Sequence, residues 1–136
     1  KLIPVSIFAH MAHTLVVYTQ YYDTGPRSVD TKQHWLEQLA YLIGALKAVP
    51  EGDGTLFDNT VIWWCTEISH GNVHERRDMP FLLAGGAGGT FQTGRYLRYQ
   101  DVPHNNLHVS LMNAMGIDDQ TFGNPAYCTG PLSGLA

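Results

Sequence analysis

Two short apolar runs, separated by a polar loop, lie in the middle of the chain. The first is Thr60–Cys65 (TVIWWC), and Asp58-Asn59 before it is typical of a turn. The second is Met79–Ala84 (MPFLLA), which leads into the glycine-rich Gly85–Gly89. Short runs rich in β-branched and aromatic residues, bounded by turn signals, are typical of buried strands. We therefore predict two strands, joined by a polar loop.

The clearest helix prediction covers Ser28–Val49. Its apolar residues recur at spacings of three and four, namely Trp35, Leu36, Leu39, Leu42, Ile43 and Leu46. A stripe of this kind faces a core, so we predict that it is buried against Thr60–Cys65. Ser28 or Asp30 is suited to the N-cap, and Pro50 ends the helix.

A second helix is predicted between Pro103 and Gly116, because proline is favoured at helix starts and glycine just after helix ends. Its apolar side consists of Leu107, Leu111, Met112, Ala114 and Met115. His104 begins this helix, and His108 follows one turn later on the same face.

The remaining segments predict smaller features. Leu2–Phe8 is an apolar run that contains a proline, which suits an edge strand, and Leu15–Tyr18 is a second short run. We expect a plain turn at Glu51–Gly54, a hairpin at Thr90–Tyr99 and an irregular surface tail at Ile117–Ala136. Together these features predict one α/β domain over residues 1–136, a sheet with flanking helices.

The polar loop after the first strand is dense in titratable groups. It holds Glu67, His70, His74 and Asp78. Carboxylate oxygen and neutral imidazole nitrogen are good ligands for zinc, manganese or iron. His10 and His13 near the start of the chain could join such a site. The same residues also suit a solvated loop in which Glu67 caps a turn, and the pattern alone leaves both interpretations open.

Five segments resemble a known family in order and spacing. They are DNTVIWWCTEISHGNVHERRDMPFLLAGGAGG, TGRYLRY, PHNNLHVSLMNAMGI, TFG and GPLSGL. Over roughly Trp35 to Leu135 the chain resembles the C-terminal part of the domain-of-unknown-function 1552 family of exported bacterial proteins. That family in turn resembles a divergent branch of the alkaline phosphatase and sulfatase superfamily. The resemblance implies the C-terminal part of an alkaline-phosphatase-like fold.

The resemblance also implies a metal site. It places Glu67 at the acidic ligand position that follows a strand, and His70 or His74 at the histidine position. Asp78 and His104 are further ligand candidates. The superfamily usually has an Asp-His pair at the strand end, where this chain has Glu67-Ile68. A divalent metal such as zinc, manganese or calcium is the implied cofactor.

Two functions follow from these observations. The first is a divergent metal-dependent hydrolase-like domain of the phosphate or sulfate ester class, in which the metal polarises the ester. No segment resembles the superfamily's nucleophile-bearing part, so we expect no turnover from this polypeptide alone. The second is a non-catalytic structural or accessory subunit of a larger exported assembly. Its partner would be a missing N-terminal part or another subunit.

Charge and cysteine content limit the partners and the cellular location that the chain could have. The net charge of −4 leaves no basic footprint for nucleic acid, and no apolar run is as long as a membrane span. Lys1 begins the chain without a methionine or a signal peptide, which indicates a processed or partial chain. The family resemblance implies a periplasmic or extracellular location. We expect Cys65 to be a buried thiol, and a bridge to Cys128 stays open.

Overall fold

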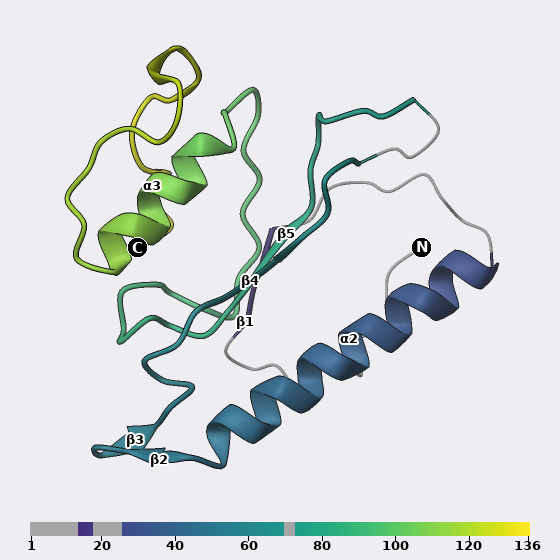
Figure 1. Cartoon of the computed structure of the whole chain (residues 1–136), viewed down its shortest axis with the longest axis vertical. Coiled ribbons are helices and arrows are strands. Elements are labelled where there is room, and N and C mark those ends of the chain that lie inside the picture. The colour runs from purple at the N-terminus through teal and green to yellow at the C-terminus, as the bar shows by residue number, and fades with distance from the viewer. Residues whose placement is uncertain (1–13, 18–25, 70–72) are drawn as a thin grey trace.

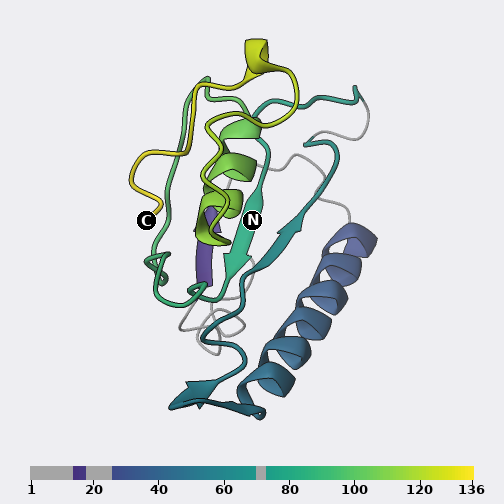
Figure 2. The same ribbon diagram turned by 60° about the vertical axis from the view of Figure 1, so that its left-hand side comes forward.

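The computed structural model describes residues 14–17, 26–69 and 73–136. A three-stranded sheet lies between two helices, one on each face (Figure 1, Figure 2). The order across the sheet is β1 (Thr14–Val17), β5 (Phe81–Ala84) and β4 (Ile62–Cys65), and both pairings are antiparallel. The helices are α2 (Pro26–Lys47) and α3 (Asn105–Ala114). The predicted mixed α/β arrangement is confirmed at this level, while the alkaline-phosphatase-like fold stays a prediction.

The alternation of side chains along β4 and β5 gives the sheet its two apolar faces. Trp64 pairs with Leu82 and Ile62 pairs with Ala84, and these four residues pack on the α2 side. Successive side chains of a strand point to opposite faces, so the residues between them point toward α3. The α2 side of the core is completed by Leu36, Leu39, Ile43 and Phe57, each at most 7% exposed.

The predicted buried stripe of α2 is only partly right. Leu39 and Ile43 are buried and Leu46 packs against the core, as expected, but Trp35 is 57% exposed and Leu42 is 45% exposed. The reason is helical geometry. Trp35 and Leu42 stand one residue before Leu36 and Ile43, which places them about 100° around the helix from the buried row. The three-stranded sheet covers a narrower arc of the helix than the full run of apolar residues offers.

The second core lies between the sheet and α3. Its buried residues are Leu83, Ala87, Phe91, Leu107 and Leu135. Trp63 and Phe81 from the sheet pack against this group, together with Leu111 from α3. Val109 of α3 is completely buried. The helix therefore packs on the second core through Leu107, Leu111 and Ala114, as predicted, whereas Met115 of its predicted apolar side is 56% exposed.

The segment after α3 is irregular and lies along the surface, as predicted, apart from the short 3₁₀ helix η1 (Pro125–Tyr127), and Leu135 anchors it to the core. Leu135 is only 1% exposed and belongs to the second core. The Leu132 amide donates to Ser110 Oγ at 2.8 Å, and Arg95 donates to the Leu135 carbonyl at 2.6 Å. Asn106 donates to Thr129 Oγ1 and accepts from its amide. Sequence periodicity misses such a segment because single anchor residues, not a repeat, hold it.

Two tight turns shape the chain around the sheet. The predicted turn at Glu51–Gly54 is confirmed, and it joins the two-residue strands β2 (Pro50–Glu51) and β3 (Gly54–Thr55). Gly85 follows β5 with φ +97°, and a Cβ there would lie 2.1 Å from the Thr60 carbonyl oxygen. Only glycine fits this close approach.

Three further expectations from the sequence concern a hairpin, an edge strand and a membrane span. The predicted hairpin at Thr90–Tyr99 is wrong, because these residues, all described, form no β-strand pair of their own. The Phe91 amide instead donates back to the Gly86 carbonyl, and Arg95 donates to the Gln92 carbonyl. The predicted strand Leu2–Phe8 lies outside the described residues. No helix in the described part of the chain is long and apolar enough to cross a membrane.

Candidate functional site

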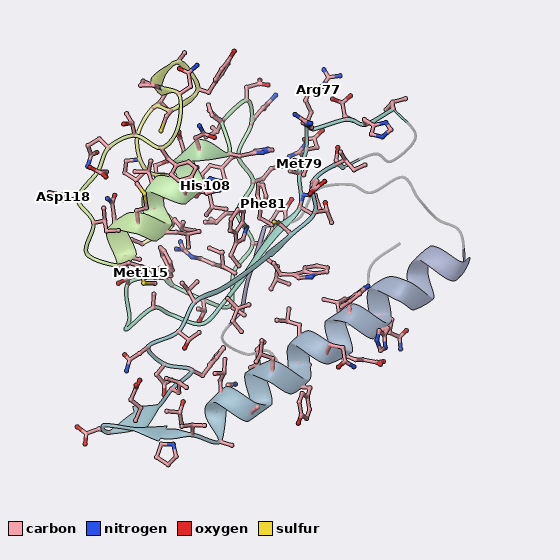
Figure 3. The ribbon with its side chains drawn as sticks, viewed as in Figure 1. Arg77, Met79, Phe81, His108, Met115 and Asp118 are labelled. Carbon is pink, nitrogen blue, oxygen red and sulfur yellow. The ribbon has the colours of Figure 1, made fainter. Side chains whose placement is uncertain are left out.

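The candidate site lies where β4 ends and β5 begins. Cys65 ends β4 and pairs with Phe81, the first residue of β5. The His104 ring meets the Phe81 ring edge to face, with centroids 4.9 Å apart. The start of α3 is therefore at the same end of the sheet from which the Glu67 loop leaves β4. Figure 3 shows Phe81 and His108 in the space between the sheet and α3.

Antiparallel pairing changes the reason for expecting a site here. In parallel sheets, ligands bind outside the carboxyl ends of the strands because all those ends meet at one edge. Here β5 runs against both neighbours, so that rule does not apply. It is the start of α3 that brings imidazole groups to the strand end occupied by Cys65 and, two residues later, Glu67.

His104 is held as a neutral imidazole. Burial lowers its pKa below the ordinary value, and the neighbouring His108 lowers it further. A neutral imidazole keeps one nitrogen lone pair, so it can bind a metal ion or accept a proton. This is the chemistry expected of His104 from the sequence, although its role as a metal ligand stays a prediction.

His108 is enclosed by aromatic rings. It stacks on Phe122 at 4.4 Å with an interplanar angle of 4°, and Trp63 meets it edge to face at 4.8 Å. Its Nδ1 lies 3.2 Å from the His104 carbonyl oxygen, which can only accept a hydrogen bond. A hydrogen bond here therefore requires Nδ1 of His108 to be the donor. The spacing of His104 and His108 predicts a shared face, but Phe122 comes from an aperiodic segment that gave no signal.

Trp63 contributes an unusual polar atom to this aromatic group. Its indole Nε1 is buried and has no hydrogen-bond partner, the only such side-chain atom in the part of the chain that the structure describes. A buried donor without a partner costs free energy. Trp63 is held in place by packing instead, against His108 and against Phe81 at 6.0 Å.

Cys65 differs from its prediction. It is exposed rather than buried, because it is the last residue of an outer strand of the described sheet. Partial burial of the sulfur and the charge of Glu67 raise its pKa, so the thiol stays protonated at neutral pH. A protonated thiol is a poor nucleophile. Cys128 is buried, both cysteines are free, and no bridge joins them.

The described ends of the loop between β4 and β5 are held by a few polar contacts. The Ser69 amide donates to the Glu75 carbonyl at 2.8 Å, and Arg77 pairs with the Glu75 carboxylate at 2.9 Å. The Arg77 hydrogen bonds lower the pKa of Glu75 to about 2. In Figure 3, Arg77 lies toward the outer end of this loop and Met79 nearer to the sheet. Sequence inspection missed this pair, which the two-residue spacing of an acid and a base could have indicated.

The predicted metal ligands are only partly described. Glu67, His74 and Asp78 are exposed, and His74 and Asp78 have positive φ angles of 53° and 51°. His70 lies outside the described residues, as do His10 and His13. Among the described residues, no three His, Cys, Asp or Glu side chains gather as a metal site. The set of Glu67, His70, His74, Asp78 and His104 therefore remains a prediction.

Comparisons with known proteins add no further information. No protein family, no curated protein and no solved structure matches the chain. The resemblance drawn from the sequence segments consequently stays an expectation.

Proposed function

We propose that this chain is a divergent metal-dependent hydrolase-like domain of the phosphate or sulfate ester class, and that it is inactive alone. The observation that carries the proposal is the position of His104. A neutral imidazole stands at the strand end from which Glu67 and the histidine-containing loop depart. Imidazole and carboxylate together suit zinc or manganese, and oxygen ligands alone would suit calcium.

The described residues offer no activated nucleophile for ester cleavage. Cys65 ends β4 at this strand end, and its raised pKa keeps it protonated. A bound divalent ion would supply charge to polarise an ester, but an attacking group must also be held in line with the ester bond. Glu67 and His104 would be occupied as ligands. We therefore propose that this domain binds the metal ion but does not by itself form a complete catalytic centre.

Metal content of the purified chain tests the proposed metal binding directly. We expect the purified chain, dialysed against zinc or manganese, to retain the ion at a stoichiometry near one by elemental analysis. Glu67→Gln and His104→Ala should each weaken binding at least about tenfold in calorimetric titrations, as loss of a ligand or its supporting contact does. His34→Ala is the matched control, because His34 is exposed on α2, on the other face of the sheet. Binding unchanged in both variants would refute the assignment.

Turnover tests the claim of inactivity. We expect the isolated chain to release no product from aryl phosphates or aryl sulfates with zinc, manganese, calcium or magnesium. A metal-bound water could still attack without a side-chain nucleophile. Metal-dependent turnover that is lost in Glu67→Gln would therefore make this chain an enzyme in its own right.

A specific observation favours the second candidate, an accessory subunit. Large apolar side chains are exposed on α2 at Trp35 and Leu42, which are seven residues apart and so lie on one side of the helix. Tyr41 is exposed about 100° further around, and Val49 just after the helix. Neighbouring exposed apolar groups such as Trp35 and Leu42 often mark an interface. The partner would be a missing N-terminal part or another subunit. Absence of bound metal from the purified chain would favour this candidate over the first.

A further inference from the structure

His104 and His108 lie on one side of α3, at its start. His104 precedes the first helical residue but already has helical angles, φ −59° and ψ −28°. Side chains four residues apart on a helix are neighbours, with Cβ atoms about 5–6 Å apart. Histidine pairs at this spacing on a helix bind a single zinc ion in metalloproteases. The start of α3 therefore places two imidazoles within reach of one ion.

Both imidazoles pack against aromatic side chains of the sheet. The His104 ring meets Phe81 at 4.9 Å, and the His108 ring meets Trp63 at 4.8 Å. Phe81 and Trp63 are themselves neighbours, with centroids 6.0 Å apart, and Figure 3 shows Phe81 and His108 in this layer. Burial and the neighbouring His108 both lower the pKa of His104, and the second effect requires that the two rings lie close together. Neither histidine is fully buried, so an ion from solvent can reach them.

His108 has the surroundings of a metal ligand. Its ring stacks on Phe122 at 4.4 Å, and Asn105 Nδ2 holds Phe122 by donating to its carbonyl at 2.8 Å. A hydrogen bond from Nδ1 of His108 to the His104 carbonyl, 3.2 Å away, leaves the lone pair of the neutral ring on Nε2. Histidines that bind metals almost always donate their other ring N–H to a carbonyl, a carboxylate or water. The ring is therefore oriented before an ion arrives.

We propose that His104 and His108 together chelate one zinc, nickel or copper(II) ion, through one ring nitrogen of each. Neutral imidazole suits these ions, whereas calcium and magnesium prefer oxygen ligands. The chelate needs only two described side chains, so it is compatible with the finding that no three His, Cys, Asp or Glu side chains gather among the described residues.

This chelate rests on the metal-binding function proposed above and makes it more specific. It adds His108, which is not among the ligands predicted from the sequence, and it names the class of metal ion. Two imidazoles leave coordination positions of the ion open, so Glu67 stays the candidate for a further ligand.

Copper(II) tests where the ion binds, because this paramagnetic ion broadens the NMR signals of nearby protons. The probes are the indole N–H signals of Trp63 and Trp35 in the untagged chain. Trp63 lies 4.8 Å from the His108 ring. Trp35 is the internal control, since it lies 5.9 Å from His34, a single exposed imidazole on α2. We expect substoichiometric copper to broaden the Trp63 signal first, because two imidazoles hold the ion more tightly than one. Earlier or equal loss of the Trp35 signal would overturn the proposal.

Zinc titration calorimetry tests the contribution of His108. His108→Phe keeps an aromatic ring beside Trp63 and Phe122 but has no nitrogen, so the packing of α3 is retained. We expect it to weaken zinc binding at least about tenfold, as loss of a ligand does. His34→Phe is the matched control and should bind zinc as wild type does. An excess of calcium should not displace the zinc. Wild-type zinc affinity in His108→Phe, or displacement by calcium, would contradict the chelate.

Comparison with Glu67→Gln separates this chelate from the function proposed above. If Glu67→Gln and His104→Ala lose zinc while His108→Phe keeps it, the proposed metal binding stands and the role of His108 is wrong. If His104→Ala and His108→Phe lose zinc while Glu67→Gln keeps it, the chelate stands and the role of Glu67 is wrong. Full zinc affinity in His104→Ala would refute both.

Discussion

Replacing Leu36 with alanine is the most direct test of how α2 packs. Leu36 is 1% exposed and lies in the core between α2 and the sheet. The change removes three carbon atoms, worth about 2.4 kcal/mol at ~0.8 kcal/mol for each buried methylene. The cavity that remains adds to this loss, and buried leucine-to-alanine changes cost about 2–5 kcal/mol. We expect Leu36→Ala to lower the free energy of unfolding by about 3 kcal/mol.

Leu42→Ala provides the matched comparison on the same helix. Leu42 is 45% exposed, so water already contacts nearly half of its surface and fills the space left by the change. About half of the transfer free energy is lost and little cavity forms. We expect a cost of about 1 kcal/mol. If Leu36 and Leu42 were equally buried, as the apolar stripe in the sequence predicts, both changes would lower the free energy of unfolding equally. The structure instead predicts a loss about three times larger for Leu36→Ala.

Urea denaturation, followed by circular dichroism and by tryptophan fluorescence, measures both losses. Coincident transitions from the two probes would establish that a single free energy describes unfolding. Equal slopes against urea in wild type and variants would show that the changes act on stability alone. A loss for Leu36→Ala below about 1 kcal/mol, or one no larger than that of Leu42→Ala, would mean that α2 presents a different face to the sheet.

Two further predictions follow from single contacts. Gly85→Ala should lower the free energy of unfolding by more than about 3 kcal/mol, because the new Cβ would clash with the Thr60 carbonyl. Gly44→Ala should raise it by about 0.5–1 kcal/mol, because a Cβ at this position on α2 lies in open space. Thermal melts in which Gly85→Ala is not the less stable variant would count against the described turn. The lowered pKa of His104 means that the unfolded state binds the proton more readily, so the free energy of unfolding should fall as pH drops below about 6.5. His104→Gln should remove that part of the decline between pH 6.5 and 5, and an unchanged slope would show that His104 is not held neutral.

Much of the fold follows from local patterns. The α2 helix, α3, both central strands and the turn at Glu51–Gly54 were all indicated by periodicity, caps and glycines. Each of these signals is short in range, so the sequence carries it without reference to distant residues. The helix even begins at Pro26, two residues before its predicted start, as proline is favoured in the first turn.

The errors share a physical cause, since burial depends on partners far along the chain. Cys65 looks like a core residue within TVIWWC, but its strand has a described neighbour on one side only. Leu135 lies in an aperiodic tail that was predicted to pack along the surface, but its side chain is buried in one cluster with Leu107 and Phe91. For the candidate site, the His104–His108 spacing was visible in advance. The stacking of Phe122 depends on the path of an aperiodic segment and was not.

The division of the core into two layers bears on how the protein folds during synthesis. The layer against α2 draws on residues from Leu36 to Ala84, so all its members leave the ribosome early. The layer against α3 needs Leu135, which is made 51 residues after Ala84 (135 − 84). Synthesis proceeds at about 5–20 residues per second, so several seconds separate the two events. Until α3 and then Leu135 have been made, the apolar surface around Leu83 and Trp63 is incompletely covered, the stage at which a chaperone would have most to bind.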